Sequence, residues 1–402
     1  MKKTLVAIAA LAAFGAQAQS TVTLSGVVDA GYQSIKNFGG QQTNQVGQNG
    51  ARTSTFKFNG TEDLGGGQSA NFQFEVQPSY IAGNGNAYNA TVAAGTTAPI
   101  ANGSTQGTNQ ASAQSGLVGK GQSFVGLKDA KYGEVQFGTI NTATFGAFAA
   151  VSHLGTGVGT GYGSGNTFGD ITRVESSLAY KSPSIAGFDF SVLKGTNNDS
   201  QFGVASSTAT GVTLRRPRVL DLGIGYTNGP LAVKFGRLES TATANEGAAG
   251  SYKNGLKTTT QLLGAAYDAG VAKVALATGS IKNDATDTTH VVDNKLTVAA
   301  VTVPFGANRV IAQYGTNAAN GNSISYNTGL KAKTTGLAFE RDLSKRTYVY
   351  VRYEKTDLAA FAASGYIVNG AAVAASSTTA AVGWGSTDPQ RTVTTVGLSH
   401  AF

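Results

Sequence analysis

Charged side chains that alternate with apolar ones are the residues with the clearest chemical potential in this 402-residue sequence. Lys57 stands between Phe56 and Phe58, and Glu75 follows an alternating Phe-Gln-Phe stretch. Since successive side chains of an extended chain point to opposite faces, the charges gather on one face of a sheet and the apolar groups on the other. A face of fixed charges attracts or repels mobile ions, so we treat it as the candidate functional surface.

Catalysis and metal binding have little support in the sequence. The three histidines, His153, His290 and His400, occur without an H-E-x-x-H motif, a partner four residues away or a suitable neighbouring carboxylate. The glycine-rich stretch GTGVGTGYGSG at 155–165 lacks the Lys-Ser/Thr that follows a phosphate-binding loop. We therefore expect neither an enzyme nor a bound cofactor or metal ion.

The elements that must position the charges are all of one kind. Apolar alternation recurs in about sixteen segments of roughly ten residues, the strand length expected of membrane barrels. Examples are TFKFNGTE, LDLGIGYT, KLTVAAVTV and TYVYVRYEK. No convincing helix lies between these segments, so the pattern predicts an all-β protein.

The connections between the expected strands alternate in length. Short turn-rich links such as EDLGGG, TNGP and DLSKR alternate with long ones such as 79–121, 140–172 and 356–390. In an up-and-down barrel every second connection lies at the same end, so the alternation predicts tight turns at one rim and long loops at the other. A Greek-key sandwich has no reason to keep such a strict order.

Residues 1–18 predict a cleaved signal peptide, which leaves 19–402 as a single barrel domain. Two lysines precede an apolar stretch at 5–14 and an A-x-A site at 16–18. The chain has no cysteine, so an exported form cannot rely on disulfides. No later apolar run approaches the ~20 residues of a membrane helix. The dispersed Lys and Arg, despite a net charge of +8, do not favour nucleic-acid binding.

The C-terminal segment RTVTTVGLSHAF still alternates up to Phe402. In hydrocarbon every backbone N–H and C=O must be paired, so the last strand should pair with the first and leave no edge. Phe402 would then anchor the rim as part of an aromatic girdle. A barrel of about sixteen strands is too wide for side chains to fill, so its polar face lines water and its apolar face meets lipid.

With these features the chain resembles the Gram-negative porins of the beta-proteobacterial general-diffusion type. The matching segments are STVTLSGVVDAG, GTEDLGGG, FVGLKD followed by YGEVQFG, YKSPSIAGF, DLSKRTYVY and VGLSHAF. The resemblance implies a homotrimer of transmembrane, antiparallel sixteen-stranded barrels in the outer membrane, in contact with lipid and lipopolysaccharide. Each barrel would carry its third long loop inside the lumen and pass small hydrophilic solutes and anions.

On this mapping the third loop spans 141–171, and Asp170 is its only carboxylate. Thr55 and Thr139 stand where relatives commonly carry Arg, so we expect only a weak to moderate anion preference. The expected pore-lining cations are Lys57, Arg173, Lys181, Lys234, Lys273, Arg309 and Arg352, with Glu75, Asp221 and Glu354 opposing them.

A different class of function stays open at this point. The long Gly, Ala, Ser, Thr and Asn-rich loops, such as 83–116, would also suit a surface interaction or adhesion barrel. Conductance in a planar bilayer separates the two alternatives.

Overall fold

The computed structural model describes residues 21–36, 42–78, 80–81, 121–162, 171–195, 218–241, 256–284, 293–319, 331–359, 366–368, 371–373 and 390–402. The predicted signal peptide lies outside the described residues, and its boundary stays a prediction.

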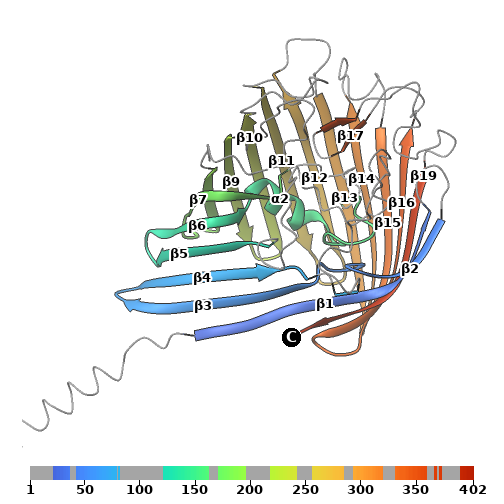
Figure 1. Cartoon of the computed structure of the whole chain (residues 1–402), viewed down its shortest axis with the longest axis horizontal. Helices are drawn as coiled ribbons and strands as arrows, with labels where there is room; N and C mark the ends of the chain where they lie inside the picture. Colours follow the sequence, from blue (N-terminus) through green and yellow to red (C-terminus); the bar gives the residue numbers. More distant parts are fainter. Residues whose placement is uncertain are drawn as a thin grey trace, which may run out of the picture.

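One large antiparallel sheet makes up almost all of the described chain (Figure 1). Its strands are β1 (Thr21–Lys36), β2 (Gln42–Gln48), β3 (Thr55–Gly65), β4 (Gln68–Val76), β5 (Ser123–Asp129), β6 (Gly133–Asn141), β7 (Arg173–Lys181), β8 (Phe188–Gly195), β9 (Arg218–Asn228), β10 (Leu231–Thr241), β11 (Lys257–Asp268), β12 (Lys273–Asn283), β13 (Asp293–Phe305), β14 (Asn308–Ala319), β15 (Lys331–Asp342), β16 (Thr347–Ala359) and β19 (Gln390–Ala401). The short strands β17 (Tyr366–Val368) and β18 (Ala371–Val373) pair only with each other.

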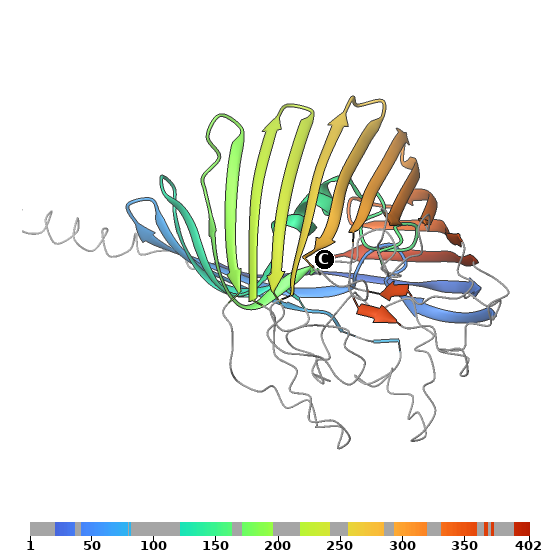
Figure 2. The ribbon, with the colours of Figure 1, turned by 90° about the horizontal axis from the view of Figure 1, so that it is seen from above.

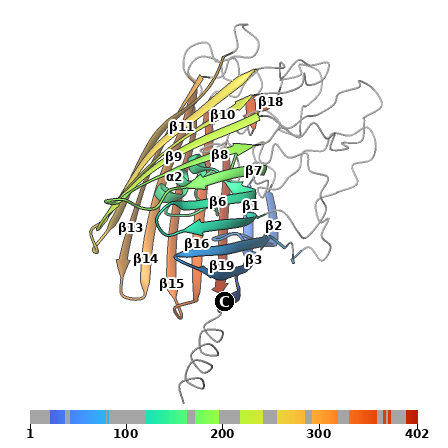
Figure 3. The ribbon, with the colours of Figure 1, turned by 90° about the vertical axis from the view of Figure 1, so that its left-hand side faces the viewer.

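Each strand pairs with its neighbours in the chain, and the sheet closes on itself. β1 pairs with β19 along its second half, and β2 and β3 pair with the second and first halves of β1. β2 and β3 together therefore occupy one position, and the result is a closed antiparallel barrel of sixteen strands (Figure 2). The predicted fold class is confirmed. The strands run obliquely around the barrel, as Figure 3 shows from the side.

Side-chain alternation separates the two faces of the wall as the sequence predicts. On β15, Leu337 and Phe339 are exposed on the outer face, whereas Thr334, Ala338 and Glu340 are buried on the inner face. The strands are thus apolar toward the lipid side and polar or small toward the lumen, which is the alternation that a membrane barrel requires.

The short connections explain the GTEDLGGG segment. Gly65, Gly66 and Gly67 all have positive φ, at 81°, 63° and 85°, which only glycine adopts without strain. Asp63 Oδ1 accepts a hydrogen bond from the Gly65 amide at 2.8 Å. These residues close the tight β3–β4 turn, at what we call the short-turn rim.

Phe402 completes the seam between the first and last strands. Its amide donates to the Gly26 carbonyl at 3.1 Å, and the Gly26 amide donates to the Phe402 carbonyl at 3.2 Å. The Phe402 ring lies 5.5 Å from that of Phe56, and any Cβ at position 26 would stand 2.5 Å from Phe402 Cζ. The predicted pairing of the last strand with the first is confirmed.

One helix, α2 (Ala143–Val151), contradicts the expectation that no helix lies between the strands. Thr142 caps it, because its Oγ1 accepts a hydrogen bond from the Phe145 amide at 3.1 Å. The segment ATFGAFAAV is apolar on every side, so it carries no amphipathic period that would reveal a helix in the sequence. Within the described part of the chain, no helix is long and apolar enough to cross a membrane.

Candidate functional site

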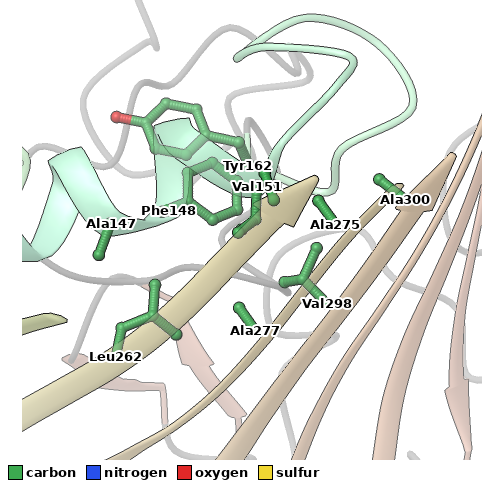
Figure 4. Close-up of a cluster of buried hydrophobic side chains, with 10 residues drawn as sticks. Ala147, Phe148, Val151, Tyr162, Leu262, Ala275, Ala277, Val298 and Ala300 are labelled. Atoms are coloured by element: carbon green, nitrogen blue, oxygen red, sulfur yellow. The ribbon is translucent and has the colours of Figure 1, made fainter. Parts of the chain in front are cut away.

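The segment 143–162, which contains α2, packs against the inner face of the barrel wall. Phe148 and Val151 of α2 and the following Tyr162 form one buried cluster with wall residues Leu262, Ala275, Ala277, Val298 and Ala300 (Figure 4). The adjacent residues Leu263 and Leu276 are exposed on the opposite face. The segment therefore lies inside the barrel, and Figure 2 shows α2 within the ring of strands.

The start of α2 is held by a wall carboxylate. Asp221 on β9 accepts hydrogen bonds from the Ala143 amide at 2.5 Å and from Thr144 Oγ1 at 2.7 Å. A negative charge at a helix N-terminus also interacts favourably with the helix dipole. Gly236 on β10 permits this approach, because a Cβ there would collide with the backbone of Thr144.

The end of the segment is held by two further charged residues of the wall, each with its own counter-charge. Arg352 Nη1 donates to the Leu154 carbonyl at 2.8 Å, and Arg352 Nη2 lies 2.5 Å from Glu340 Oε1. Glu354 Oε2 accepts the Gly159 amide at 2.8 Å, while its Oε1 pairs with Arg391 at 2.9 Å. Each buried charge thus has a counter-charge or a backbone partner, as burial demands.

A second inward element interrupts the wall between β2 and β3. Asn49 takes a positive φ of 65°, and the chain turns into the lumen over 49–54. The fully buried Asp29 carboxylate holds this turn, because it accepts the amides of Ala51 at 3.2 Å and Arg52 at 3.1 Å and the Tyr350 hydroxyl at 2.8 Å. We call residues 49–54 the inward turn.

The inward turn meets the end of segment 143–162. The Val158 amide donates to the Gly50 carbonyl at 2.8 Å, and the hydroxyls of Thr53 and Thr156 lie 3.1 Å apart. Arg52 is exposed at this junction, and no ion pair involves it within the described residues. Sequence reasoning missed Arg52, because it lies in a break between strands where the alternation that marks lumen-facing residues does not apply.

The structure brings together three of the predicted site residues near the inward turn. Lys57 Nζ lies 3.3 Å from Glu75 Oε2. Arg173 Nε donates to Asn141 Oδ1 at 3.2 Å, and its guanidinium is within electrostatic reach of Glu75. Lys57, Glu75 and Arg173 therefore form one charged group, in which Arg173 is also within electrostatic reach of Glu175.

The remaining predicted cations lie closer to the short-turn rim. Lys234 is exposed on the inner face of β10 and pairs with Gly225 of β9. The carboxylate of Asp189 lies against this glycine, so it is a neighbour of Lys234. Lys273 begins β12, and Lys181 ends β7 opposite Glu134. Arg309 is paired with Glu340 at 2.6 Å and with Asp342 at 2.8 Å. These residues face the lumen but are spread along the wall.

The model of the Gram-negative porin family matches residues 4–360 of this chain. The chain belongs to the Gram-negative porin family. Outer membrane porin protein 32 of Delftia acidovorans is 29% identical over 362 residues, covering 87% of this chain and 88% of that protein. An outer membrane porin protein of Bordetella pertussis is 28% identical over 301 residues, covering 69% of each chain.

Solved structures share the fold of this porin. The anion-selective porin from Comamonas acidovorans matches with a TM-score of 0.66 and 23% sequence identity, and the match covers 96% of this chain and 100% of that chain. The trimer form of OmpT from Vibrio cholerae matches with a TM-score of 0.60 at 15% identity, covering 95% and 99%. The porin is a protein of the Gram-negative outer membrane, and relatives of this kind favour a channel over an enzyme.

Several predicted pore residues take other positions in this porin. Arg352, Asp221 and Glu354 face inward, but all three are buried under segment 143–162 and hold it to the wall. Phe137 and its partner Val125 are exposed on the outer face of the barrel. Thr139 is two residues further along the same strand, so its side chain points to that outer face and does not line the lumen. The expectation that these four residues line the open pore is wrong, since alternation neither reveals a covering loop nor places a strand end reliably.

The last two predicted site residues are Thr55 and Asp170. Thr55 is buried at the start of β3. Asp170 lies outside the described residues.

Segment 143–162 contains two titratable side chains, His153 and Tyr162. His153 Nδ1 lies 3.0 Å from Thr302 Oγ1 on β13. Burial lowers the pKa of His153 to about 4, with a further contribution from Lys273 and an opposing one from Asp268. The imidazole is therefore neutral at pH 7, and segment 143–162 presents an uncharged surface.

Proposed function

We propose that this porin forms a water-filled channel for passive diffusion of small hydrophilic solutes and ions, with a weak to moderate preference for anions, and that it works as a homotrimer. The observation that carries the proposal is an asymmetry of exposure among the charged side chains of the inner wall and the inward turn. Asp29, Asp221, Glu340 and Glu354 are at most 3% exposed, whereas Arg52 is exposed and the Lys57 side chain is 39% exposed.

This asymmetry decides which charges a passing ion meets. The buried carboxylates are paired with backbone amides, hydroxyls and buried arginines, while Arg52 and Lys57 keep contact with water. Cations beside low-dielectric walls raise the local concentration of anions. Glu75 beside Lys57 and Asp189 near Lys234 offset part of the effect, so the preference should be weak to moderate.

The comparisons supply independent support. The solved porin from Comamonas acidovorans is described as anion-selective, and the Vibrio cholerae OmpT structure is described as a trimer. The segment 143–162, together with the inward turn, would form the narrow part of the channel, because both elements project from the wall and contact each other.

The test is the zero-current potential across a planar bilayer under a KCl gradient. We expect a chloride preference that weakens as salt shortens the Debye length from ~10 Å at 0.1 M to ~3 Å at 1 M. Arg52→Glu and Lys57→Glu should each shift the potential toward potassium. Lys194→Glu is the matched control, because Lys194 is exposed on the outer face of β8 beside Val192 and should leave the potential unchanged.

Two results would contradict the proposal. A clear potassium preference of the unmodified porin would overturn the anion preference, and no shift in either inner variant would remove Arg52 and Lys57 from the filter. Absence of any conductance would favour the adhesion alternative, whose loops, such as 83–116, lie outside the described residues.

A further inference from the structure

The break between β2 and β3 removes backbone amides from the sheet. β1 pairs with β2 over Ala30–Lys36 and with β3 over Thr21–Val27, so Val28 and Asp29 lie opposite the break. A buried N–H of the inward turn therefore needs an acceptor other than a neighbouring strand. Val28 pairs with the exposed residue His400 on the outer face, whereas Asp29 is fully buried on the inner face. Asp29 is thus the β1 residue that can supply acceptors to the turn.

The acceptors of Asp29 are used on the inward turn and on one tyrosine. Its Oδ1 accepts the Ala51 amide at 3.2 Å and the Tyr350 hydroxyl at 2.8 Å, and its Oδ2 accepts the Arg52 amide at 3.1 Å. Its backbone carbonyl accepts the Asn49 amide at 3.1 Å. Hydrogen bonds from amides to a carboxylate are stronger than those to a neutral acceptor. One residue therefore binds both the start and the middle of the turn.

Two further side chains close around this arrangement. The Asp29 amide donates to Ser54 Oγ at 3.1 Å, and the Tyr80 hydroxyl donates to the Asp29 carbonyl at 2.6 Å. Gly50 permits the approach of the turn to Tyr350, because a Cβ at Gly50 would stand 2.5 Å from the Tyr350 hydroxyl oxygen. The inward turn is therefore fixed from several sides around Asp29.

The Asp29 carboxylate binds the backbone of Arg52 and leaves its charge free. The bond goes to the Arg52 amide, and among the described residues no ion pair involves the guanidinium. The Arg52 side chain is exposed, and its guanidinium is within electrostatic reach of Tyr348 on β16. The position of this water-exposed charge therefore depends on the residue that holds its backbone.

We propose that Asp29 is a positioning residue for ion selectivity, because its carboxylate fixes the inward turn so that Arg52 stands in the passage, and that Tyr350 in turn orients this carboxylate. The inference rests on the proposed function of Arg52 in the filter. It adds that a buried acid supports the preference for anions. The direct field of a carboxylate favours cations, so the positioning effect and the direct effect have opposite signs.

Asp29→Asn separates the two effects by the sign of the change. The substitution removes one negative charge, so a direct effect alone would shift the zero-current potential toward chloride. The new amide nitrogen is a donor, and it must face the amide of either Arg52 or Ala51, which then loses its acceptor. Release of the turn would displace Arg52, so we expect a shift toward potassium.

The measurement is the zero-current potential under a KCl gradient. Tyr350→Phe changes no charge and should give a smaller shift toward potassium. Asp342→Asn is the matched control, because it also removes one carboxylate charge, from a residue that pairs with Arg309 and not with the inward turn, and it should shift the potential toward chloride. Amide hydrogen exchange at 50–53 should accelerate about tenfold in Asp29→Asn, the equivalent of one charge-assisted hydrogen bond, and remain unchanged in Asp342→Asn.

The Arg52→Ala background tests whether Asp29 acts through Arg52. There, Asp29→Asn should give no further shift toward potassium, and the same shift as in the unmodified porin would overturn the proposal. A shift toward chloride, or no shift, in folded Asp29→Asn would also overturn it, with folding checked by heat-modifiable electrophoretic mobility. If Asp29→Asn does not assemble, Tyr350→Phe decides, since no shift in that variant contradicts the proposal.

Arg52→Glu distinguishes failure of this inference from failure of the proposed function. No shift in Arg52→Glu would remove Arg52 from the filter and the positioning role of Asp29 with it. A shift in Arg52→Glu without the expected shift in Asp29→Asn would leave the filter in place and overturn the role of Asp29 alone.

Discussion

On the inner wall from β9 to β16, the carboxylates of Asp221, Glu340 and Glu354 are covered and bound; on β3 and the inward turn, two cations are open to water. Asp221 and Glu354 accept amides of segment 143–162, and Glu340 pairs with Arg352 beneath it. Lys57 on β3 and the inward-turn residue Arg52 instead keep exposed side chains. The same inward orientation therefore gives two roles, attachment of the loop and contact with solutes.

The difference teaches that the covering segment, and not the wall alone, sets the charge of the lumen. A hydrogen bond to a charged group contributes about 1.5–3 kcal/mol, and removal of one partner leaves a buried charge uncompensated. The covered carboxylates are thus structural, although their parity is that of pore-lining residues.

Neither part of the inner wall can form unless the barrel closes, so loss of Phe402 from the closing seam should have the largest effect on assembly. Deletion of Phe402, or Phe402→Asp, removes the ring against Gly26 and Phe56 and, in the deletion, both hydrogen bonds to Gly26. We expect little assembled porin at the cell surface, measured by heat-modifiable mobility of outer-membrane fractions. Phe402→Tyr keeps the ring and should assemble. Normal surface levels of the deletion would show that the seam does not need its last residue.

A matched pair of glycine substitutions distinguishes inner positions that segment 143–162 covers from inner positions that it leaves open. A Cβ at Gly336 on β15 would collide with the backbone carbonyl of Gly159, whereas a Cβ at Gly225 on β9 meets only the carboxylate end of the Asp189 side chain. Gly336→Ala should therefore displace the loop from Glu354 and accelerate amide hydrogen exchange at 152–162 by about tenfold, the equivalent of one charge-assisted hydrogen bond. Gly225→Ala should leave exchange there unchanged; equal effects of the two variants would erase the distinction.

Acid should weaken the covered side in a smaller, graded way through His153. Its ordinary pKa is 6.5, and burial lowers it to about 4 in the packed loop. The packed loop holds His153 in its neutral form, so the histidine contributes its full stabilisation only above its ordinary pKa of 6.5. This stabilisation falls as the pH drops from 6.5 to about 4, where the imidazole becomes protonated in the packed loop as well. Hydrogen exchange at 143–162 should accelerate over that range in addition to the intrinsic pH effect. His153→Gln should abolish the extra acceleration; the same acceleration in that variant would assign it to other groups.

The sequence predicted the barrel because the information is local and repeated. Alternation on each strand, the GTEDLGGG turn and the terminal Phe402 each restate the same architecture, and the structure confirms their consequences. The sequence also predicted Lys57, Glu75 and Arg173 as pore-lining side chains, but only the structure shows that the three lie close together. Helix α2 was missed, because an apolar segment without a period gives no sign of which face will be buried.

The sequence by itself determined, except at strand ends such as Thr139, which side chains face the lumen and which face the lipid, since that depends on the two-residue period of a strand. Only the tertiary structure decided which inward charges remain available to solutes. Arg352 and Lys57 have the same parity, yet one is buried against Leu154 and Glu340 and the other is open to water. The physical reason is that exposure depends on segments brought together from far along the chain, such as 143–162 and β16, and no local pattern encodes where a loop will come to rest.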